Sequence, residues 1–188
     1  MAIFESGNAV IAQSGGPTAA INATLAGVIK GCLDNPAIEK TYGVKFGMEG
    51  LLAGDFIDMD DYGFTKEDFD LLSATPGAAL GSCRTRIEDD ETITKVLEVL
   101  AKHNVRYVFY IGGNDSMDAI AKMSAYVEAH EDAWQANFIG VPKTIDNDLY
   151  LTDHTPGYGS AAKYVAVCTQ EIIRDIASYT TKAVTIIE

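Results

Sequence analysis

A short apolar run late in the chain is followed directly by a cluster of polar and charged residues. Five of the six residues after Pro142 carry charged or hydrogen-bonding side chains: Lys143, Thr144, Asp146, Asn147 and Asp148. If this segment is extended, Asp146 and Asp148 face the same side, because side chains alternate along a strand. One carboxylate can then accept a proton while the other holds a divalent cation, as phosphoryl transfer to an alcohol requires. A solvated turn is the alternative, since Asp and Asn are common turn formers.

The residues before this cluster predict a strand that brings it to the edge of a sheet. Phe138–Val141 are apolar throughout, as in a strand that is covered on both faces. Proline cannot donate to a sheet ladder, so we expect strand pairing to stop at Pro142. The polar side chains then open into the crevice beyond the carboxyl end of the strand, where open α/β sheets bind ligands.

Two glycine turns have the pattern of strand, turn and helix. Ala9–Ala12 lead into a turn that contains Gly15 and Gly16, and Tyr107–Ile111 lead into a second glycine turn. Backbone amides and the positive end of the helix dipole make such turns favourable for an anion. The first turn lacks the closing Gly-Lys-Ser/Thr of a P-loop and the third glycine of a dinucleotide fingerprint. The helix after the second turn begins with three polar residues: Asn114, Asp115 and Ser116.

A third candidate segment places Arg84 and Arg86 next to Gly81 and several small polar residues. Arginine binds phosphate through two parallel hydrogen bonds, so this segment is a candidate phosphate-binding loop. An ordinary surface loop is the alternative.

Strands alternate with helices along the chain, which predicts a three-layer, Rossmann-like α/β fold with a mostly parallel sheet and helices on both faces. Right-handed crossovers put every glycine turn at the same edge of the sheet, so Gly15, Asn114 and Asp146 should converge. We expect Gly47–Gly54 to be a looser segment. The other expected elements are strands at 41–46, 56–59 and 183–187 and helices at 66–72, 91–103 and 161–178.

Length and composition predict one domain over residues 1–188, because 47% hydrophobic residues suffice for one sizeable core. The net charge of −13 argues against nucleic acid as a partner, since the clustered Lys and Arg that bind phosphate backbones are missing. A small phosphorylated ligand stays compatible with this charge. Cys32, Cys83 and Cys168 are expected to be reduced core thiols. With neither a signal peptide at residues 1–8 nor a membrane anchor, we expect a cytoplasmic protein.

Five motifs occur in family order and with matching spacing: Gly15-Gly16 with Asn22, Gly81-Ser82 with Arg84, Gly112–Ser116, Pro142–Asp148 and Thr155–Tyr158. Together they resemble the phosphofructokinase family over nearly all of the chain, and the Thr-Ile-Asp-Asn-Asp motif is highly specific. The resemblance implies the fold of that family's N-terminal domain. It also implies transfer of a phosphoryl group to the 1-hydroxyl of fructose 6-phosphate, from ATP in one branch and from pyrophosphate in another.

Two residues indicate the pyrophosphate-dependent branch. Asp115 and Lys143 stand where the ATP-dependent branch has glycines that leave room for the α-phosphate of the nucleotide. Asp115 would repel that phosphate, and Lys143 can neutralise a bare diphosphate. The alternatives are an ATP-dependent 6-phosphofructokinase and a truncated, non-catalytic anion-binding domain.

The resemblance also implies roles for individual residues. Asp146 matches the general base, Arg84 matches a phosphate-binding arginine, and Lys143 completes the catalytic set. Thr144 and Asp148 are expected to bind substrate together with Asp146. The expected donor-binding residues are Gly15, Gly16, Asp115 and Ser116.

Magnesium is the implied cofactor, with Asn114 and Asp148 as its expected ligands. The family usually has an acidic residue at the position of Asn114, so the metal site is expected to carry less protein charge here. Family members continue into a Met-Gly-Arg segment and a sugar-phosphate domain further C-terminal, partly supplied by a neighbouring subunit. We therefore expect residues 1–188 to be the phosphoryl-donor domain of a homo-oligomer, and the chain to be a piece of a longer protein.

Overall fold

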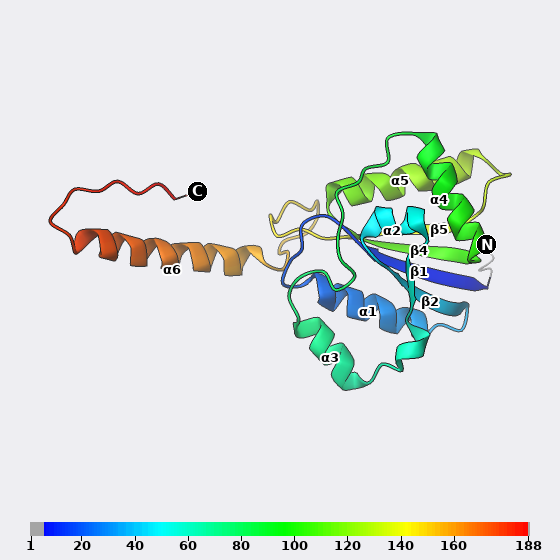
Figure 1. Ribbon diagram of the computed structural model, residues 1–188, viewed down its shortest axis with the longest axis horizontal. Coiled ribbons are helices and arrows are strands. Elements are labelled where there is room, and N and C mark those ends of the chain that lie inside the picture. The colour runs from blue at the N-terminus through cyan, green and yellow to red at the C-terminus, as the bar shows by residue number, and fades with distance from the viewer. Residues whose placement is uncertain (1–5, 188) are drawn as a thin grey trace. The chain divides into compact units, whose positions relative to one another are not determined.

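The computed structural model describes residues 6–187, so expectations about residues 1–5 and Glu188 lie outside the described residues. The chain divides into two compact units, Met1–Lys143 and Thr144–Glu188, which are described separately (Figure 1).

The first unit is built on a five-stranded sheet with the strand order β3-β2-β1-β4-β5. Its strands are β1 (Gly7–Gln13), β2 (Ile38–Val44), β3 (Phe56–Asp58), β4 (Val105–Gly112) and β5 (Asn137–Pro142). All neighbouring strands are parallel except β2 and β3, which are antiparallel. The expected mostly parallel sheet is confirmed.

Helices cover both faces of this sheet, which confirms the three-layer α/β architecture (Figure 1). The helical elements of the first unit are α1 (Ile21–Leu33), α2 (Gly47–Ala53), the 3₁₀ turn η1 (Asp60–Tyr62), α3 (Lys66–Ala74), α4 (Asp90–Lys102) and α5 (Asn114–Ala129). Helices α1 and α3 pack on one face, and α2, α4 and α5 pack on the other. Alternate residues of β1 enter the two cores, because successive strand side chains point to opposite faces.

Helix α4 shows how a local pattern becomes a covering helix. The Asp89 side chain caps its first turn by accepting a hydrogen bond from the Thr92 N–H at 2.8 Å. Its apolar residues recur at helical spacing and are all buried: Ile93, Val96, Leu97 and Leu100. This spacing predicted the helix at 91–103, and the structure confirms it.

The expectation of a looser segment at 47–54 is wrong, because α2 occupies most of it. Gly47 and Gly50 lower the intrinsic helix propensity, but Met48 and Leu51 are fully buried against the sheet. Burial of these two side chains stabilises the helix that the local sequence disfavours.

The expectation that β5 is covered on both faces is also wrong for this chain. Strand β5 is an edge strand, and its residues from Phe138 to Val141 are only half-buried. The strand ends at Pro142, as expected, in register with Gly112 of β4. An edge position tolerates proline because only one side of the strand needs ladder hydrogen bonds.

The second unit contains the loop 144–157 and the helix α6 (Tyr158–Ala177). The strand expected at 183–187 is wrong, because these residues pair with no strand in the described part of the chain. None of the helices described within residues 6–187 is both long and apolar enough to cross a membrane.

All three cysteines are free thiols, and two of them belong to the core. Cys32 and Cys83 are buried, as expected, whereas Cys168 on α6 is only half-buried. Burial, helped by the nearby Asp60 carboxylate, raises the pKa of the Cys32 thiol from its usual 9.0 to about 12.

Cys32 should make the stability of the protein depend on pH in the alkaline range. The folded state holds the thiol proton more tightly than the unfolded state, so this contribution is complete below pH 9 and is lost as the pH rises towards about 12. The free energy of unfolding, measured with urea from about pH 8 to about pH 11, should fall more steeply for wild type than for Cys32→Ala. Thr24→Ala on the same helix removes no titrating group, so it is the control and should keep the wild-type slope. Equal slopes for wild type and Cys32→Ala would contradict the prediction.

Candidate active site

A pocket of about 270 Å³ lies at the carboxyl ends of β1 and β4. The strand order reverses between these two strands, since β2 follows on one side of β1 and β4 lies on the other. Such a switch point is where open α/β sheets bind ligands. Seven of the predicted site residues line the pocket: Gly15, Gly16, Arg84, Asn114, Asp115, Ser116 and Lys143.

The turn after β1 forms one wall of the pocket. Gly15 has a φ of +76°, in the left-handed region that favours glycine. A side chain there would have room, because its Cβ would lie 3.6 Å from both the Gly113 nitrogen and Lys143 Nζ. The backbone conformation therefore requires this glycine. The Gly15 N–H donates to the Cys83 carbonyl at 3.2 Å, so this amide is bonded within the chain here.

The turn after β4 meets the turn after β1 at very short range. A Cβ on Gly112 would lie 2.6 Å from Ser116 Cβ and 2.8 Å from Ser14 Oγ, so only glycine fits. The hydroxyls of Ser14 and Ser116 are hydrogen-bonded to each other, and both side chains are buried. Ser116 therefore fastens the start of α5 to the end of β1.

Lys143 crosses the pocket from the end of β5. Its N–H donates to the Gly112 carbonyl at 2.8 Å, which fixes the backbone beside β4. Its Nζ donates to the Gly16 carbonyl at 2.6 Å, so the ammonium group lies against the first turn. The half-buried cation and the amino-terminal end of α5 give the pocket a positive wall.

Two buried amides hold the segment that carries Arg84 against β1. The Gln13 side chain accepts from the Leu80 N–H at 3.0 Å and donates to Asn22 Oδ1 at 3.1 Å. Asn22 accepts from the Ala79 N–H at 2.9 Å and donates to the Thr75 carbonyl at 2.9 Å. Sequence reasoning did not select Gln13, although a polar residue ending an apolar strand was the available signal.

The floor of the pocket is neutral. Burial raises the pKa of Tyr110 above its ordinary value, so its hydroxyl stays protonated at physiological pH. Cys83 lies beside it and is also buried. The charged residues that line the pocket are Arg84, Asp115 and Lys143.

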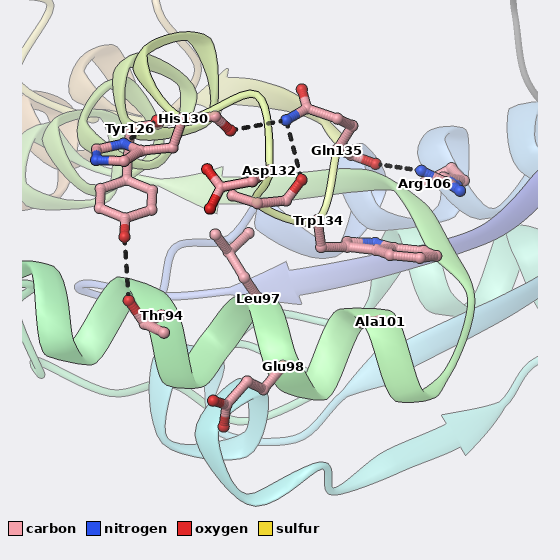
Figure 2. A pocket seen from close by; sticks show the side chains of 11 residues that line it. Thr94, Leu97, Glu98, Ala101, Arg106, Tyr126, His130, Asp132, Trp134 and Gln135 are labelled. Atoms are coloured by element: carbon pink, nitrogen blue, oxygen red, sulfur yellow. Dashed lines mark hydrogen bonds between the residues drawn. The ribbon is translucent and has the colours of Figure 1, made fainter.

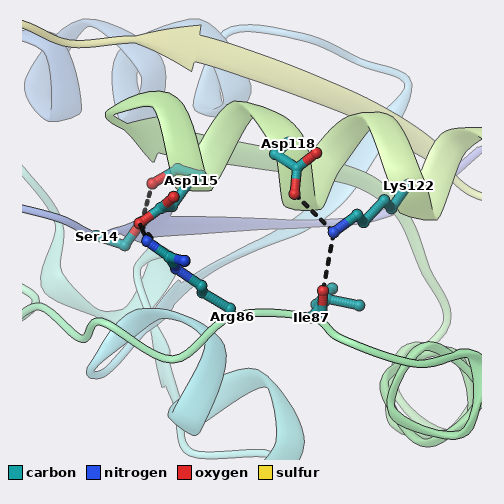
Figure 3. Close-up of polar contacts among 7 residues, drawn as sticks. Ser14, Arg86, Ile87, Asp115, Asp118 and Lys122 are labelled. Atoms are coloured by element: carbon teal, nitrogen blue, oxygen red, sulfur yellow. Dashed lines mark hydrogen bonds and ion pairs between the residues drawn. The ribbon is translucent and has the colours of Figure 1, made fainter.

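Asp115 is the acidic member of this set, and it is paired with an arginine (Figure 3). Arg86 Nη2 and Nε donate to Asp115 Oδ2 at 3.0 and 3.2 Å. Two turns further along α5, Lys122 is paired with Asp118 at 2.7 Å and donates to the Ile87 carbonyl at 3.1 Å. The segment after Arg84 is thus attached to α5 at two points.

The predicted residues Thr144, Asp146 and Asp148 belong to the second unit and form a turn. Thr144 Oγ1 donates to Asp148 Oδ1 at 2.8 Å and accepts from the Asp146 N–H at 3.0 Å. Asn147, between the two carboxylates, has a φ of +58°. The extended conformation considered for this segment is therefore wrong, and the carboxylates are presented by a turn.

The Thr155–Tyr158 motif supports this turn. Asn147 Oδ1 accepts from the Thr155 N–H at 2.9 Å, and Thr155 is buried. A Cβ on Gly157 would lie 2.7 Å from Ile145 Cγ2, and the φ of Gly157 is +119°, so glycine is needed there for space and for conformation. These contacts explain why two motifs separated in sequence act as one structural piece.

A larger cavity of about 560 Å³ lies away from the switch point, between α4, α5 and the loop 130–135 (Figure 2). Trp134 donates from Nε1 to the carbonyl of Val105, the first residue of β4, at 2.7 Å. The Arg106 guanidinium lies 3.8 Å above its ring. Trp134 is therefore a packing residue, and this cavity lies at the amino end of β4, opposite the predicted site residues.

The fold and the pocket define a doubly wound α/β protein with a pocket at the switch point. Residues 8–188 match the family described as Phosphofructokinase, and the chain belongs to this family. A solved structure of a pyrophosphate-dependent phosphofructokinase from Nitrosospira multiformis matches 92% of the chain with a TM-score of 0.79 and 40% identity, over 42% of its own length.

Two curated relatives show the range of donors named in the family. A pyrophosphate–fructose 6-phosphate 1-phosphotransferase from Halomonas elongata is 44% identical over 176 residues, which are 91% of this chain and 41% of the relative. An ATP-dependent 6-phosphofructokinase from Lactobacillus acidophilus is 32% identical over 169 residues, which are 89% of this chain and 48% of the relative. The chain thus spans less than half the length of these relatives.

Removing the buried amide of Asn22 should loosen the pocket wall that carries Arg84. Asn22→Ala leaves the Ala79 N–H and Gln13 without their partner, which should lower the free energy of unfolding by about 2–3 kcal/mol. Urea unfolding measures the change. Lys30→Ala on the exposed side of α1 is the control, because it removes a solvent-exposed ion pair with Asp34 that contributes little to stability. Similar unfolding curves for the two variants would contradict this assignment.

Proposed function

We propose that this chain is the phosphoryl-donor domain of a pyrophosphate-dependent 6-phosphofructokinase. The reaction transfers a phosphoryl group from pyrophosphate to the 1-hydroxyl of fructose 6-phosphate and gives fructose 1,6-bisphosphate and phosphate. The observation that carries the proposal is that Asp115 and Lys143 both line the switch-point pocket. The names of the Halomonas and Nitrosospira relatives support it.

The choice of donor follows from the charges of these two side chains. The family resemblance implies that ATP-dependent members have glycine at the positions of Asp115 and Lys143. These glycines leave room for the α-phosphate. Here Lys143 Nζ is held against Gly16 and neutralises a bare diphosphate. Asp115 repels a third phosphate and occupies its space, so ATP is excluded by charge and by volume.

In the proposed reaction, Asp146 removes the proton from the sugar hydroxyl as that oxygen attacks the phosphoryl group. Arg84, Lys143 and the backbone amides at Gly15 and Gly16 stabilise the charge on the phosphoryl oxygens. Release of the Gly15 amide from the Cys83 carbonyl is part of this proposal, because the two are hydrogen-bonded here. The base contributes roughly 10²–10⁴-fold, and positioned cations contribute most of the remainder.

Magnesium fits this site only together with the donor. Within residues 6–187, no three or more His, Cys, Asp and Glu side chains gather as a metal site. Mg²⁺ often takes one or two protein oxygens and completes its shell with water and substrate phosphates. We propose that Asn114 and Asp148 supply such oxygens, with Thr144 orienting the Asp148 carboxylate through its hydroxyl. A bound Mg²⁺ would supply positive charge against the diphosphate oxygens.

The sugar-phosphate contacts are proposed to come from a C-terminal domain and from a neighbouring subunit of a cytoplasmic homo-oligomer. Two observations support this: the chain belongs to the family, and it covers less than half the length of the Halomonas relative. An ATP-dependent 6-phosphofructokinase and a non-catalytic anion-binding domain are the alternatives.

Isothermal titration calorimetry of this chain with pyrophosphate and with ATP, each with Mg²⁺, tests the donor. We expect binding of pyrophosphate without binding of ATP. Lys143→Met should weaken pyrophosphate binding at least about tenfold, because the diphosphate loses a half-buried cation. Lys95→Met removes an exposed cation on α4 and is the matched control.

The same titrations separate the alternatives. Preferred binding of ATP by the wild-type chain would favour the ATP-dependent form. If the double variant Asp115→Gly and Lys143→Gly failed to bind ATP better than wild type, the explanation by charge and volume would be wrong.

Turnover tests the assignment of the base. In the protein that carries this chain, Asp146→Asn should lower kcat by roughly 10²–10⁴-fold while pyrophosphate binding changes little, because only proton removal is lost. Asp153→Asn, an exposed carboxylate of the same loop, is the control. Near-normal kcat for Asp146→Asn would exclude it as the base.

A further inference from the structure

A carboxylate lines a pocket that is proposed to bind an anion, and this needs a physical explanation. Asp115 lies in the first turn of α5, on the pocket wall that also carries Asn114 and Ser116. An unpaired carboxylate there would repel pyrophosphate as well as ATP. The pocket accepts one donor and excludes the other only if the charge of Asp115 is partly neutralised and its carboxylate is held in place.

We propose that Arg86 is the positioning residue that meets both conditions, an inference that rests on the proposed function. Arg86 does not line the pocket and acts through Asp115. Its Nε and Nη2 both donate to the same carboxylate oxygen, Asp115 Oδ2, at 3.2 and 3.0 Å (Figure 3). This edge-on contact restrains the carboxylate and places a full positive charge behind it.

The backbone next to Arg86 is attached to α5, and this attachment helps to hold Arg86 close to Asp115. Ile87 is buried, and its carbonyl accepts a hydrogen bond from Lys122 at 3.1 Å. Lys122 is in turn paired with Asp118 on the same helix at 2.7 Å. Figure 3 shows both attachments to α5: Arg86 reaches Asp115 in the first turn, and the Ile87 carbonyl meets Lys122 two turns later.

The ion pair itself contributes little to folding, because both side chains are 64% exposed. The ion pair instead changes the electrostatic potential in the pocket. With Arg86 present, the diphosphate meets a partly neutralised carboxylate beside Arg84 and Lys143. Without Arg86, it meets the bare negative charge of Asp115. Folding and donor binding can therefore be separated by mutation.

The test is a double-mutant cycle on Arg86 and Asp115, read by calorimetric titration of this chain with magnesium pyrophosphate. Arg86→Met should weaken binding about tenfold, because Asp115 becomes an unpaired like charge. In the Asp115→Asn background the same change should weaken binding by no more than about twofold, because no charge is left to neutralise. Arg86→Lys should recover most of the wild-type affinity, and Lys95→Met is the control.

Each outcome decides the question. An equal loss from Arg86→Met in both backgrounds would mean that Arg86 contacts the diphosphate directly, which overturns the positioning role. No loss from Arg86→Met overturns it as well. Failure of wild type to bind pyrophosphate would overturn the proposed function and this inference with it. Urea unfolding of each variant verifies folding, and Arg86→Gln replaces Arg86→Met in the cycle if the latter is unfolded.

Discussion

The contact between the ends of β1 and β4 is the constraint on which the rest of the first unit depends. Gly112 has no space for a side chain because Ser14 and Ser116 occupy it, and the two serine hydroxyls are bonded to each other. This contact joins two turns that lie about a hundred residues apart in sequence. Helices on both faces then bury the sheet whose strand ends carry the pocket at the switch point.

Residues of both charges line the pocket on this frame. Lys143 and Arg84 supply cations, α5 supplies the positive end of its dipole, and Asp115 supplies the opposing charge. In such a site a carboxylate can discriminate between phosphoryl donors if a neighbouring cation limits its repulsion of the bound anion. Arg86 is placed to limit the repulsion by Asp115. In the role proposed for it, the exposed Arg86–Asp115 pair acts on ligand choice and contributes little to stability.

The second unit presents its carboxylates on a turn that is built from its own side chains. Thr144 bonds to both Asp146 and Asp148, and Asn147 ties the turn to Thr155. These bonds define the local shape of the turn while Asp146 stays exposed. An exposed base on a preformed turn suits the proton transfer proposed for Asp146, since little reorganisation is then needed.

The sequence by itself determined the fold class and the helices with strong apolar periodicity such as α4, because periodicity and glycine turns are local signals. Most residues of the pocket were predicted from the motifs that resemble the family. Local signals failed at α2 and β5, since burial of Met48 and the edge position of β5 depend on distant segments. They also failed to select Gln13, whose partners are Leu80 and Asn22. The Arg86–Asp115 pair was decided by the tertiary structure alone, because only the packed sheet brings residues 29 positions apart within 3.0 Å.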